Sequence, residues 1–324
     1  MNLIEAFEQY AVNGISGTPD KIIETLISKL FFFGDKVYKV YKWSKAFFGD
    51  FSSLSFRKEF YQEDFFWNNA MAPHIYLELK PVRFDGSAFI DARAEDAEDF
   101  YIVMNKINET DNLTHRLITS NITPDNLKLI TREMTIRIQE LTKEKKDDLR
   151  HVIDRGLADL EKEIVGDLRS WCYMADPQYP KAKTDKMVKV LEDALGKEKY
   201  FTHFKNSDLS VAIDNHSDNI LFSDGKLGFI DIFSPRDIWR IVDPFYNICR
   251  LATDVAVLKN RDYANVMYDQ YKKIMPPGPE SVKTIYELKA ALIKGPYLSI
   301  LKRSEEAEKY FSFINQRAGE LNIL

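Results

Sequence analysis

Residues Leu30-Phe31-Phe32-Phe33-Gly34-Asp35-Lys36-Val37-Tyr38-Lys39-Val40-Tyr41 form two strand-like runs, one on each side of Gly34-Asp35. Aromatic and β-branched residues fill both runs, and a two-residue connection with glycine first is typical of a β-hairpin. Side chains alternate along a strand, so Val37 and Lys39 share one face of the second run. The stretch predicts an aromatic hairpin that presents a lysine beside a small β-branched residue.

The rest of the first third continues this strand-rich pattern. A helix is expected over Ser55–Ala70, followed by strands over Ile75–Phe84 and Phe100–Met104 and a short one at Phe89-Ile90. These elements predict a small lobe built on a sheet, which ends in a hinge near residue 105.

Long amphipathic helices dominate after residue 122. Thr123-Pro124 combines an N-cap with proline at the first helical position, and apolar residues then hold one helical face as far as Leu141. A second stripe runs from Leu149 to Trp171 and predicts either a bundle helix or a coiled-coil partner surface. Further helices are expected over 186–195 and within 243–317.

Composition narrows the class of protein without naming a chemistry. The chain has 324 residues, 45% hydrophobic and 29% charged, with a net charge of -5. That length predicts two lobes, the 13% aromatic content excludes a disordered chain, and the slight acidity disfavours a nucleic-acid partner. We expect a cytoplasmic protein without membrane segment or signal peptide, and reduced core roles for Cys172 and Cys249.

The motif that carries chemistry lies in a short β-like island between the helices. Asp214 is followed five residues later by Asn219, and Asp231 ends the next apolar strand. This is a phosphoryl-transfer pattern, in which the first Asp accepts the proton of an attacking hydroxyl and the other two hold a metal against phosphates. Mg²⁺ suits such oxygen ligands. Asp and Asn are also ordinary turn residues, so the spacing alone leaves both interpretations open.

The first lobe offers the matching nucleotide residues. Lys39 can contact phosphates while Val37 lies under a base, and Glu63 on the following helix is available as the carboxylate partner of the lysine. Separately, Lys39 could be an edge-strand lysine and Glu63 a surface charge. The order Lys, Glu, hinge, Asp, Asn, Asp favours the functional interpretation.

Two segments of the chain resemble a bacterial group of aminoglycoside phosphotransferase-like kinases. The first covers residues 24–107 and includes Phe33–Lys39, Gly49–Leu54, Met71–Leu77 and Phe100–Lys106. In the second, over 211–251, Ile213–Asn219 is similar to the His-Gly-Asp-x-His-x-x-Asn loop of that superfamily, and Val242–Leu251 to its Asp-Pro-x-x-Asp-Leu-Ala helix start.

This chain departs from the family pattern at several positions. Ala212-Ile213 replace the His-Gly pair, Asn247 replaces the second Asp of the helix start, and His216 is retained. The missing His-Gly pair affects the conformation of the loop, whereas the charged groups for proton transfer and metal binding are all present.

The resemblance implies an α+β, protein-kinase-like two-lobe fold, with a small antiparallel-sheet N-lobe over 1–107 and a larger, mainly helical C-lobe over 108–324. It implies ATP and Mg²⁺ as cofactors, Asp214 as the base, and Asn219 and Asp231 as metal ligands. The nucleotide residues would be Lys39, Glu63, Val37, Val103, Met104 and Asn105, the last three through backbone bonds to adenine.

The predicted activity is transfer of the γ-phosphate of ATP to a hydroxyl of a small molecule such as an aminoglycoside, a sugar or an amino alcohol. Three alternatives stay open: a nucleotide-binding pseudokinase, a protein or toxin-type kinase, and an interaction protein that uses helix 149–171. The sequence sets neither the acceptor nor the oligomeric state.

Overall fold

The computed structural model describes residues 1–46, 49–151, 185, 189, 209–223, 226–236 and 239–320. The chain divides into two compact units, Met1–Asp111 with Leu221–Pro235 and Asn112–Ile220 with Arg236–Leu324. The lobe boundary at residue 107 stays a prediction. Most of the predicted helices over 149–171 and 186–195, and Cys172, lie outside the described residues.

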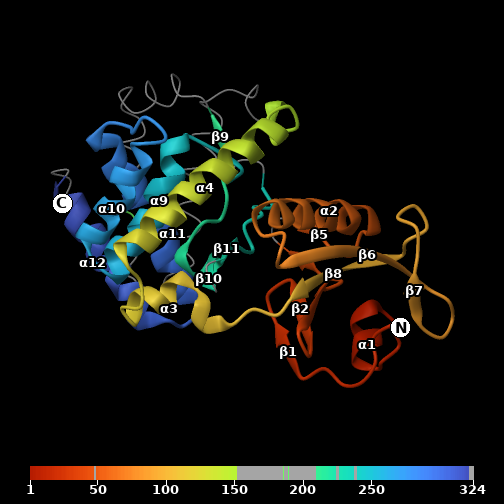
Figure 1. Cartoon of the computed structure of the whole chain (residues 1–324). Coiled ribbons are helices and arrows are strands. Elements are labelled where there is room, and N and C mark those ends of the chain that lie inside the picture. The colour runs from red at the N-terminus through yellow and green to blue at the C-terminus, as the bar shows by residue number, and fades with distance from the viewer. Residues whose placement is uncertain are drawn as a thin grey trace. The chain divides into compact units, whose positions relative to one another are not determined.

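The first unit is built on a six-stranded antiparallel sheet (Figure 1). Its strands, in spatial order, are β1 (Lys21–Glu24), β2 (Ser28–Phe33), β3 (Lys36–Tyr41), β8 (Asp99–Asn105), β6 (Tyr76–Phe84) and β7 (Phe89–Asp91). The predicted hairpin is confirmed, because β2 and β3 pair with Phe33 opposite Lys36. Gly34 turns the chain with a φ of 58°, a left-handed conformation that glycine adopts without strain. A two-stranded ribbon of β4 (Lys45–Ala46) and β5 (Gly49–Asp50) follows.

A helix covers each face of this sheet. Helix α2 (Leu54–Met71) begins at Ser53, whose side chain caps it, and it packs on the face that carries Val37, Tyr41 and Ile102. The short α1 (Leu3–Glu8) packs on the opposite face. The alternation along β3 therefore places Val37 and Lys39 on the α2 side, as the period of two predicts.

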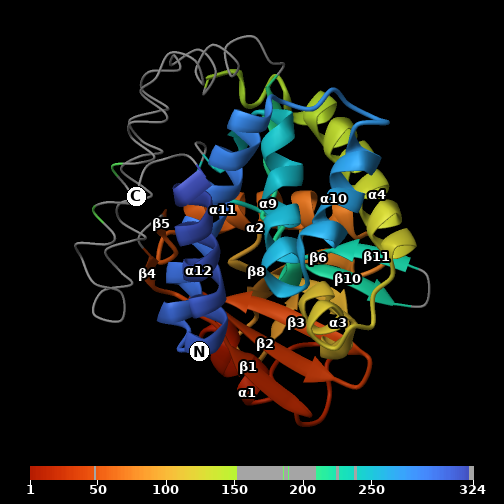
Figure 2. The same ribbon diagram turned by 90° about the vertical axis from the view of Figure 1, so that its left-hand side faces the viewer.

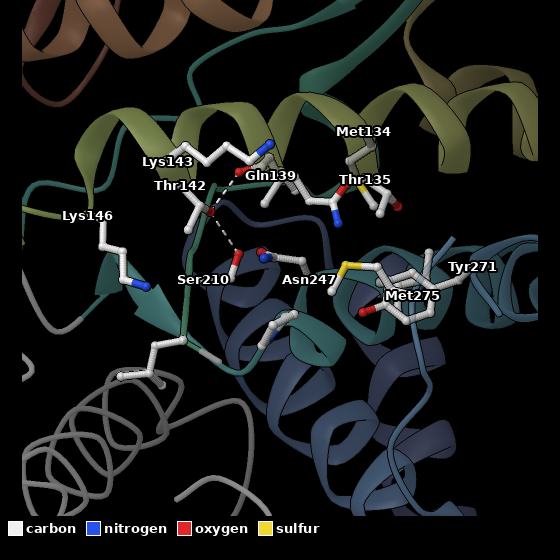
Figure 3. A pocket seen from close by; sticks show the side chains of 14 residues that line it. Met134, Thr135, Gln139, Thr142, Lys143, Lys146, Ser210, Asn247, Tyr271 and Met275 are labelled. Atoms are coloured by element: carbon white, nitrogen blue, oxygen red, sulfur yellow. Dashed lines mark hydrogen bonds between the residues drawn. The ribbon is translucent and has the colours of Figure 1, made fainter. Parts of the chain in front are cut away.

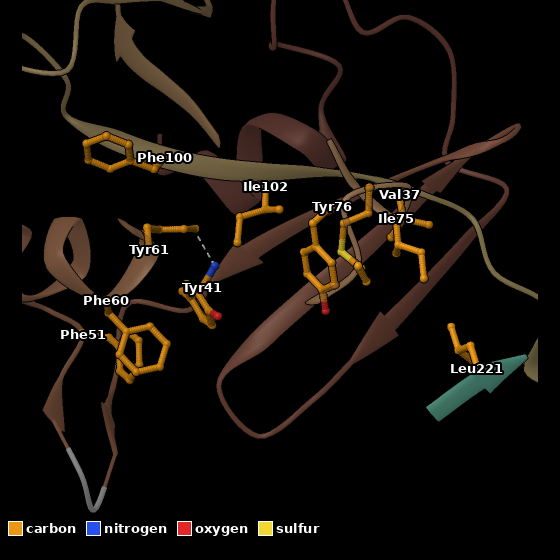
Figure 4. Close-up of a cluster of buried hydrophobic side chains, with 12 residues drawn as sticks. Val37, Tyr41, Phe51, Phe60, Tyr61, Ile75, Tyr76, Phe100, Ile102 and Leu221 are labelled. Atoms are coloured by element: carbon orange, nitrogen blue, oxygen red, sulfur yellow. Dashed lines mark hydrogen bonds between the residues drawn. The ribbon is translucent and has the colours of Figure 1, made fainter. Parts of the chain in front are cut away.

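Aromatic side chains fill the space between α2 and the sheet (Figure 4). The rings of Tyr41, Phe51 and Phe60 meet at centroid distances of 4.8 to 5.4 Å. Tyr61 contributes its ring to this core, and its hydroxyl oxygen accepts a hydrogen bond from the backbone N–H of Tyr41 at 2.8 Å. Edge-to-face packing and this bond fix α2 relative to β3.

A segment from far along the chain completes the first unit. Strands β10 (Ile220–Ser223) and β11 (Lys226–Phe229) form a hairpin, and the side chains of Leu221, Ile230 and Phe233 pack on the α2-side core. At Gly228 an added Cβ would lie 2.7 Å from Ile75 Cδ1, so a larger residue would require the end of the Ile75 side chain to move. The loop that begins at Asp231 is thereby held in the same unit as Lys39.

The second unit consists mainly of helices. Those described are α3 (Leu113–Ile118), α4 (Pro124–Lys145), α9 (Pro244–Leu258), α10 (Arg261–Tyr271), α11 (Glu280–Ile300) and α12 (Ser304–Glu320). Figure 2 shows α9 between α11 and α10, with α12 beyond α11 and α4 beyond α10. The helix predicted after Thr123 is confirmed, and Thr123 forms a capping box with Asn126. A two-stranded ladder joins β9 (Ser210–Val211) to β12 (Ile241–Val242).

The interior of this helical unit contains charge. Glu287 is fully buried and accepts hydrogen bonds from Arg261, Arg317 and Tyr268. Cys249 is a buried free thiol, as predicted. None of the described helices is both long and apolar enough to cross a membrane. The sheet-based first unit and the helical second unit confirm the predicted α+β class.

Candidate active site

Lys39 is the centre of a buried charge cluster in the first unit. Its side-chain nitrogen lies 3.1 Å from Asp64 Oδ2 and 3.1 Å from Asp231 Oδ1, and the residue is 7% exposed. The three groups come from β3, from α2 and from the loop after β11. Folding therefore brings together side chains that are up to 192 positions apart in the sequence.

Neutral donors complete the environment of the Asp64 carboxylate. Tyr41 donates its hydroxyl to Asp64 Oδ2 at 2.7 Å, and Asn68 donates its amide to Asp64 Oδ1 at 2.9 Å. The amide oxygen of Asn68 in turn accepts the backbone N–H of Ile232 at 3.0 Å. A buried carboxylate with such partners is a fixed anchor for the lysine.

Asp231 is positioned by its backbone as well as by its side chain. It adopts a φ of 47°, and its N–H donates to the hydroxyl of Tyr76 at 3.1 Å. Its carboxylate is 61% exposed although Oδ1 faces Lys39. The carboxylate of Asp231 is thus held by Lys39 through Oδ1, while much of the group remains exposed to solvent.

Charge interactions set the protonation of this cluster. Burial alone would lower the pKa of Lys39, but Asp231 and Asp64 outweigh that effect and raise it, so the lysine is a permanent cation. Burial, with the charge of Asp64, raises the pKa of Tyr41 well above its ordinary value. The phenol therefore stays protonated and donates.

The predicted partner of Lys39 is wrong by one residue. Glu63 accepts a hydrogen bond from Trp67 Nε1 at 3.0 Å, whereas the neighbouring Asp64 holds the lysine. Successive helical residues point about 100° apart, so only one of the two faces the sheet. Asp64 is 4% exposed and lies on that face; the close approach of α2 suits its shorter side chain.

The residues predicted to contact adenine lie where β3, β8 and β6 meet. Val103 and Met104 are paired with Tyr38 and Val37 on β3, and Val37 is 4% exposed. The N–H of Asn105 donates to Ile75 O at 2.8 Å, and its side chain accepts from Lys36. That N–H is already used within the first unit.

The acidic loop 214–219 belongs to the second unit. The carboxylate of Asp214 forms an ion pair with Arg250 of α9, and His216 Nε2 lies 3.8 Å from Asp214 Oδ2. Burial would raise the pKa of Asp214, yet Arg250, followed by His216 and Lys294, holds it below its ordinary value. Asp214 is therefore a carboxylate at neutral pH.

Lys294 of α11 organises the middle of the loop. It is 7% exposed, and its ammonium group lies 2.7 Å from Asp218 Oδ2 and 3.0 Å from His216 Nδ1. An ammonium group only donates, so a hydrogen bond from Lys294 to Nδ1 requires the ring proton on Nε2, toward Asp214, whereas a proton on Nδ1 would face Asp218 Oδ2 at 3.5 Å. Arg303 adds a second cation 3.6 Å from Asp218 Oδ1. Despite burial, His216 and Lys294 hold the pKa of Asp218 far below its usual range.

Backbone and amide bonds fix the shape of the loop. Asn219 donates its side-chain amide to the carbonyl of Asp214 at 2.9 Å, within the turn η2 (Ser217–Asn219). The N–H of Ser217 donates to Asp254 on α9 at 2.7 Å, and Tyr310 on α12 donates to the same carboxylate at 2.6 Å. Two predicted residues, Asp214 and Asn219, are thus adjacent.

Sequence reasoning missed the residues that support both groups. Arg250, Asp254 and Lys294 lie 36 to 80 positions beyond Asp214 in the chain and stand in no short motif around it. The only available signal was the helix start at Asp243-Pro244, which places α9 after the loop. The sequence could have indicated Asp64 only through its position on the face of α2 that is buried.

The predicted metal ligands have suitable chemistry. Asp231, in the first unit, carries a carboxylate, and Asn219, in the second unit, carries a side-chain amide whose nitrogen donates to the carbonyl of Asp214. Carboxylate and amide oxygens are the donors that Mg²⁺ prefers, and few are needed where phosphates supply the others. Each of the two residues therefore carries an oxygen of a kind that Mg²⁺ accepts as a ligand.

Comparison with known proteins identifies the fold. No family model and no curated protein matches the sequence. A choline/ethanolamine kinase family protein from Mesorhizobium loti aligns with 98% of this chain and 95% of its own at 12% identity, with a TM-score of 0.54. The GDP complex of wild-type aminoglycoside 2'-phosphotransferase-IIIa aligns over 98% of both chains at 11% identity, with a TM-score of 0.53. LicA in complex with AMP aligns over 97% of this chain and 96% of its own at 15% identity, with a TM-score of 0.53.

These alignments cover nearly the whole chain and therefore include both the sheet-based and the helical unit. The chain has the kinase-like fold of these structures, which confirms the predicted fold. At 9 to 15% identity across the similar structures the likeness concerns the fold, and function rests on the site residues.

Proposed function

We propose that this protein is a Mg²⁺- and ATP-dependent phosphotransferase that moves the γ-phosphate to a hydroxyl group of a small molecule. The Lys39 cluster is the observation that carries the proposal. A cation held between Asp64 and Asp231, with both carboxylates fixed by hydrogen bonds, is what a phosphate-binding lysine and a metal-binding aspartate require.

In the first unit each residue has a defined task. Lys39 donates to the phosphate oxygens of the nucleotide, and the ion pair with Asp64 fixes the position of the lysine side chain. Asp231 would hold Mg²⁺, which neutralises the charge that develops on the phosphates, and Asn219 of the second unit is the other proposed ligand. Val37 and Met104 supply apolar contacts for the base, and residues 103–105 are the proposed backbone contacts to adenine, although the N–H of Asn105 already donates to Ile75 O.

In the second unit Asp214 is the general base. Its carboxylate accepts the proton of the acceptor hydroxyl as the oxygen attacks the γ-phosphorus, and the ion pair with Arg250 keeps it ionised until then. His216, with its proton on Nε2, orients the carboxylate from the other side. Loss of a general base costs about 10²–10⁴-fold in rate.

The names of the similar structures support a small acceptor. They include a choline kinase from Streptococcus pneumoniae and an aminoglycoside phosphotransferase. Choline and aminoglycosides are cationic and carry hydroxyl groups, and the net charge of -5 of this chain is compatible with a cationic acceptor.

Acceptor-dependent release of ADP tests the proposal. The wild-type protein is incubated with Mg-ATP and a panel of choline, ethanolamine, aminoglycosides and simple sugars, with Asp214→Asn as the matched blank. We expect at least one acceptor to raise ADP release above the Asp214→Asn level, with phosphate on its hydroxyl. Equal, acceptor-independent rates in both proteins would contradict transfer by Asp214.

A nucleotide-binding pseudokinase is the second candidate. Two observations favour it: Ala212-Ile213 replace the His-Gly pair of the resembled loop, and Arg250 occupies a carboxylate oxygen of Asp214. A lower pKa makes Asp214 a weaker base. Stabilisation by ATP without transfer to any acceptor of the panel would favour this second function.

A further inference from the structure

A cavity of about 300 Å³ lies within the second unit, on a different set of residues from the acidic loop (Figure 3). Its walls are the C-terminal half of α4, strand β9, the first turn of α9 and the end of α10. Cavities of this size hold a small organic molecule. All the residues that line the cavity belong to the part of the chain that the structure describes.

Two buried polar atoms on the cavity wall have no hydrogen-bond partner among the described residues: Asn247 Oδ1 and the hydroxyl of Tyr271. Asn247 is 3% exposed and Tyr271 2% exposed. The amide nitrogen of Asn247 donates to Val211 O at 2.9 Å, so the atom without a partner is its oxygen, a pure acceptor. An unsatisfied buried polar group is costly, and native structures keep few of them without a reason.

The lining is mostly apolar in area, although half of the other lining residues are polar: Thr135, Gln139, Thr142, Lys143, Lys146 and Ser210. Ile138 of α4 and Ile248 of α9 line the cavity, and so do the thioether side chains of Met134 and Met275 (Figure 3). Methionine adapts its shape and makes favourable contacts with aromatic rings. Two polar atoms at fixed places beside the apolar part of the wall, which includes two methionines, suit a ligand with an aromatic body and a polar hydrogen.

We propose that this cavity is a binding site for a small aromatic compound that carries a hydroxyl or a ring N–H, the chemistry of phenols and indoles. The ligand donates its hydrogen to Asn247 Oδ1, the Tyr271 hydroxyl donates to a ligand oxygen or to its π-face, and the ring packs between Met134 and Met275. None of the residues that line the cavity belongs to the Lys39 cluster or to the loop 214–219.

Occupancy of the cavity is linked to the loop that contains Asp214. The carbonyl of Asn247 accepts the side-chain amide of Asn215 at 2.6 Å, and Met134 Sδ lies 3.3 Å from the same amide nitrogen. A ligand that contacts Asn247 and Met134 can therefore shift the side chain of Asn215, the residue next to Asp214. An effect of the ligand on turnover rests on the proposed phosphotransferase function, whereas binding of the ligand in the cavity does not.

Methyl NMR tests binding directly. The chain has eight methionines, so a protein with ¹³C-labelled methionine methyl groups gives few signals, and Met134→Leu and Met275→Leu assign the two of interest. Phenol, indole and toluene are titrated separately. We expect saturable ring-current shifts at Met134 and Met275 with phenol and indole, and smaller or no shifts at the methionines outside the cavity.

Tyr271→Phe isolates the polar contact, because it removes one hydroxyl and keeps the ring. Phenol and toluene have the same shape, so their affinity ratio reports the ligand hydroxyl. We expect the ratio to shift about fivefold toward toluene in Tyr271→Phe. Absence of saturable shifts with phenol and indole, or an unchanged ratio in the variant, would overturn the proposal; these outcomes leave ADP release by the wild-type protein unaffected as a test of the proposed function.

Discussion

The two charged clusters of this protein have opposite ratios of cations to carboxylates. In the first unit one cation, Lys39, faces the carboxylates of Asp64 and Asp231. In the second unit the carboxylates of Asp214 and Asp218 face three cations, Arg250, Lys294 and Arg303. An excess of negative charge attracts a metal ion, whereas an excess of cations keeps a base ionised. In the proposed function, the same ion-pair chemistry would serve binding in one unit and proton acceptance in the other.

The largest effect is expected when the first cluster loses its buried carboxylate. Asp64→Asn keeps the shape of the side chain but removes the buried one of the two carboxylates that compensate Lys39, and we expect the free energy of unfolding to fall by about 3 kcal/mol. Urea unfolding followed by circular dichroism measures it.

Glu63→Gln is the matched control, since Glu63 is the neighbour that sequence reasoning selected. It retains an acceptor for Trp67 Nε1, so we expect a change below about 0.5 kcal/mol. Equal destabilisation by both variants would show that Lys39 does not depend on Asp64 in particular.

A smaller effect is expected when the second cluster loses a cation. Arg250→Gln removes the main group that lowers the pKa of Asp214, so that pKa rises, and the base is protonated at a higher pH. The acid limb of the rate–pH profile should move up by about one pH unit. Arg132→Gln, an exposed change on α4, should leave the limb in place, and an unmoved limb in Arg250→Gln would exclude this role for the ion pair.

The smallest effect concerns the orientation of His216. Lys294→Met removes the donor that keeps Nδ1 unprotonated, so we expect loss of the fixed Nε2–H form in ¹⁵N spectra and a turnover about threefold to tenfold lower. Lys283→Met on the same helix, where the lysine pairs with Glu280, is the control. An unchanged tautomer in Lys294→Met would contradict the assignment made from the two distances.

Much of the fold was accessible from the sequence because local signals agree with the tertiary structure. The hairpin around Gly34 and the helix capped by Thr123 depend on turn and cap chemistry that acts over a few residues. Asp214 and Asn219 are five positions apart, and their contact forms within one loop. Alternation on β3 correctly placed Val37 and Lys39 on one face.

The rest of the site depends on long-range packing, which leaves little trace in the sequence. The choice of Asp64 over Glu63 depends on the rotation of α2 against the sheet, about 100° per residue. Arg250 and Lys294 reach the acidic loop from α9 and α11 because those helices pack together, and no spacing predicts that. The orphaned oxygen of Asn247 becomes visible only when its amide is seen bonded to Val211.

Stabilisation by nucleotide tests the central claim most directly. Thermal unfolding of the wild-type protein and of Asp231→Asn is measured with ATP, with and without Mg²⁺. We expect Mg-ATP to stabilise the wild-type protein by about 2.7 kcal/mol at a hundred times the dissociation constant, and Asp231→Asn to lose most of the part that depends on Mg²⁺. No stabilisation of the wild-type protein by ATP, with or without Mg²⁺, would contradict the claim that the Lys39 cluster binds a nucleotide.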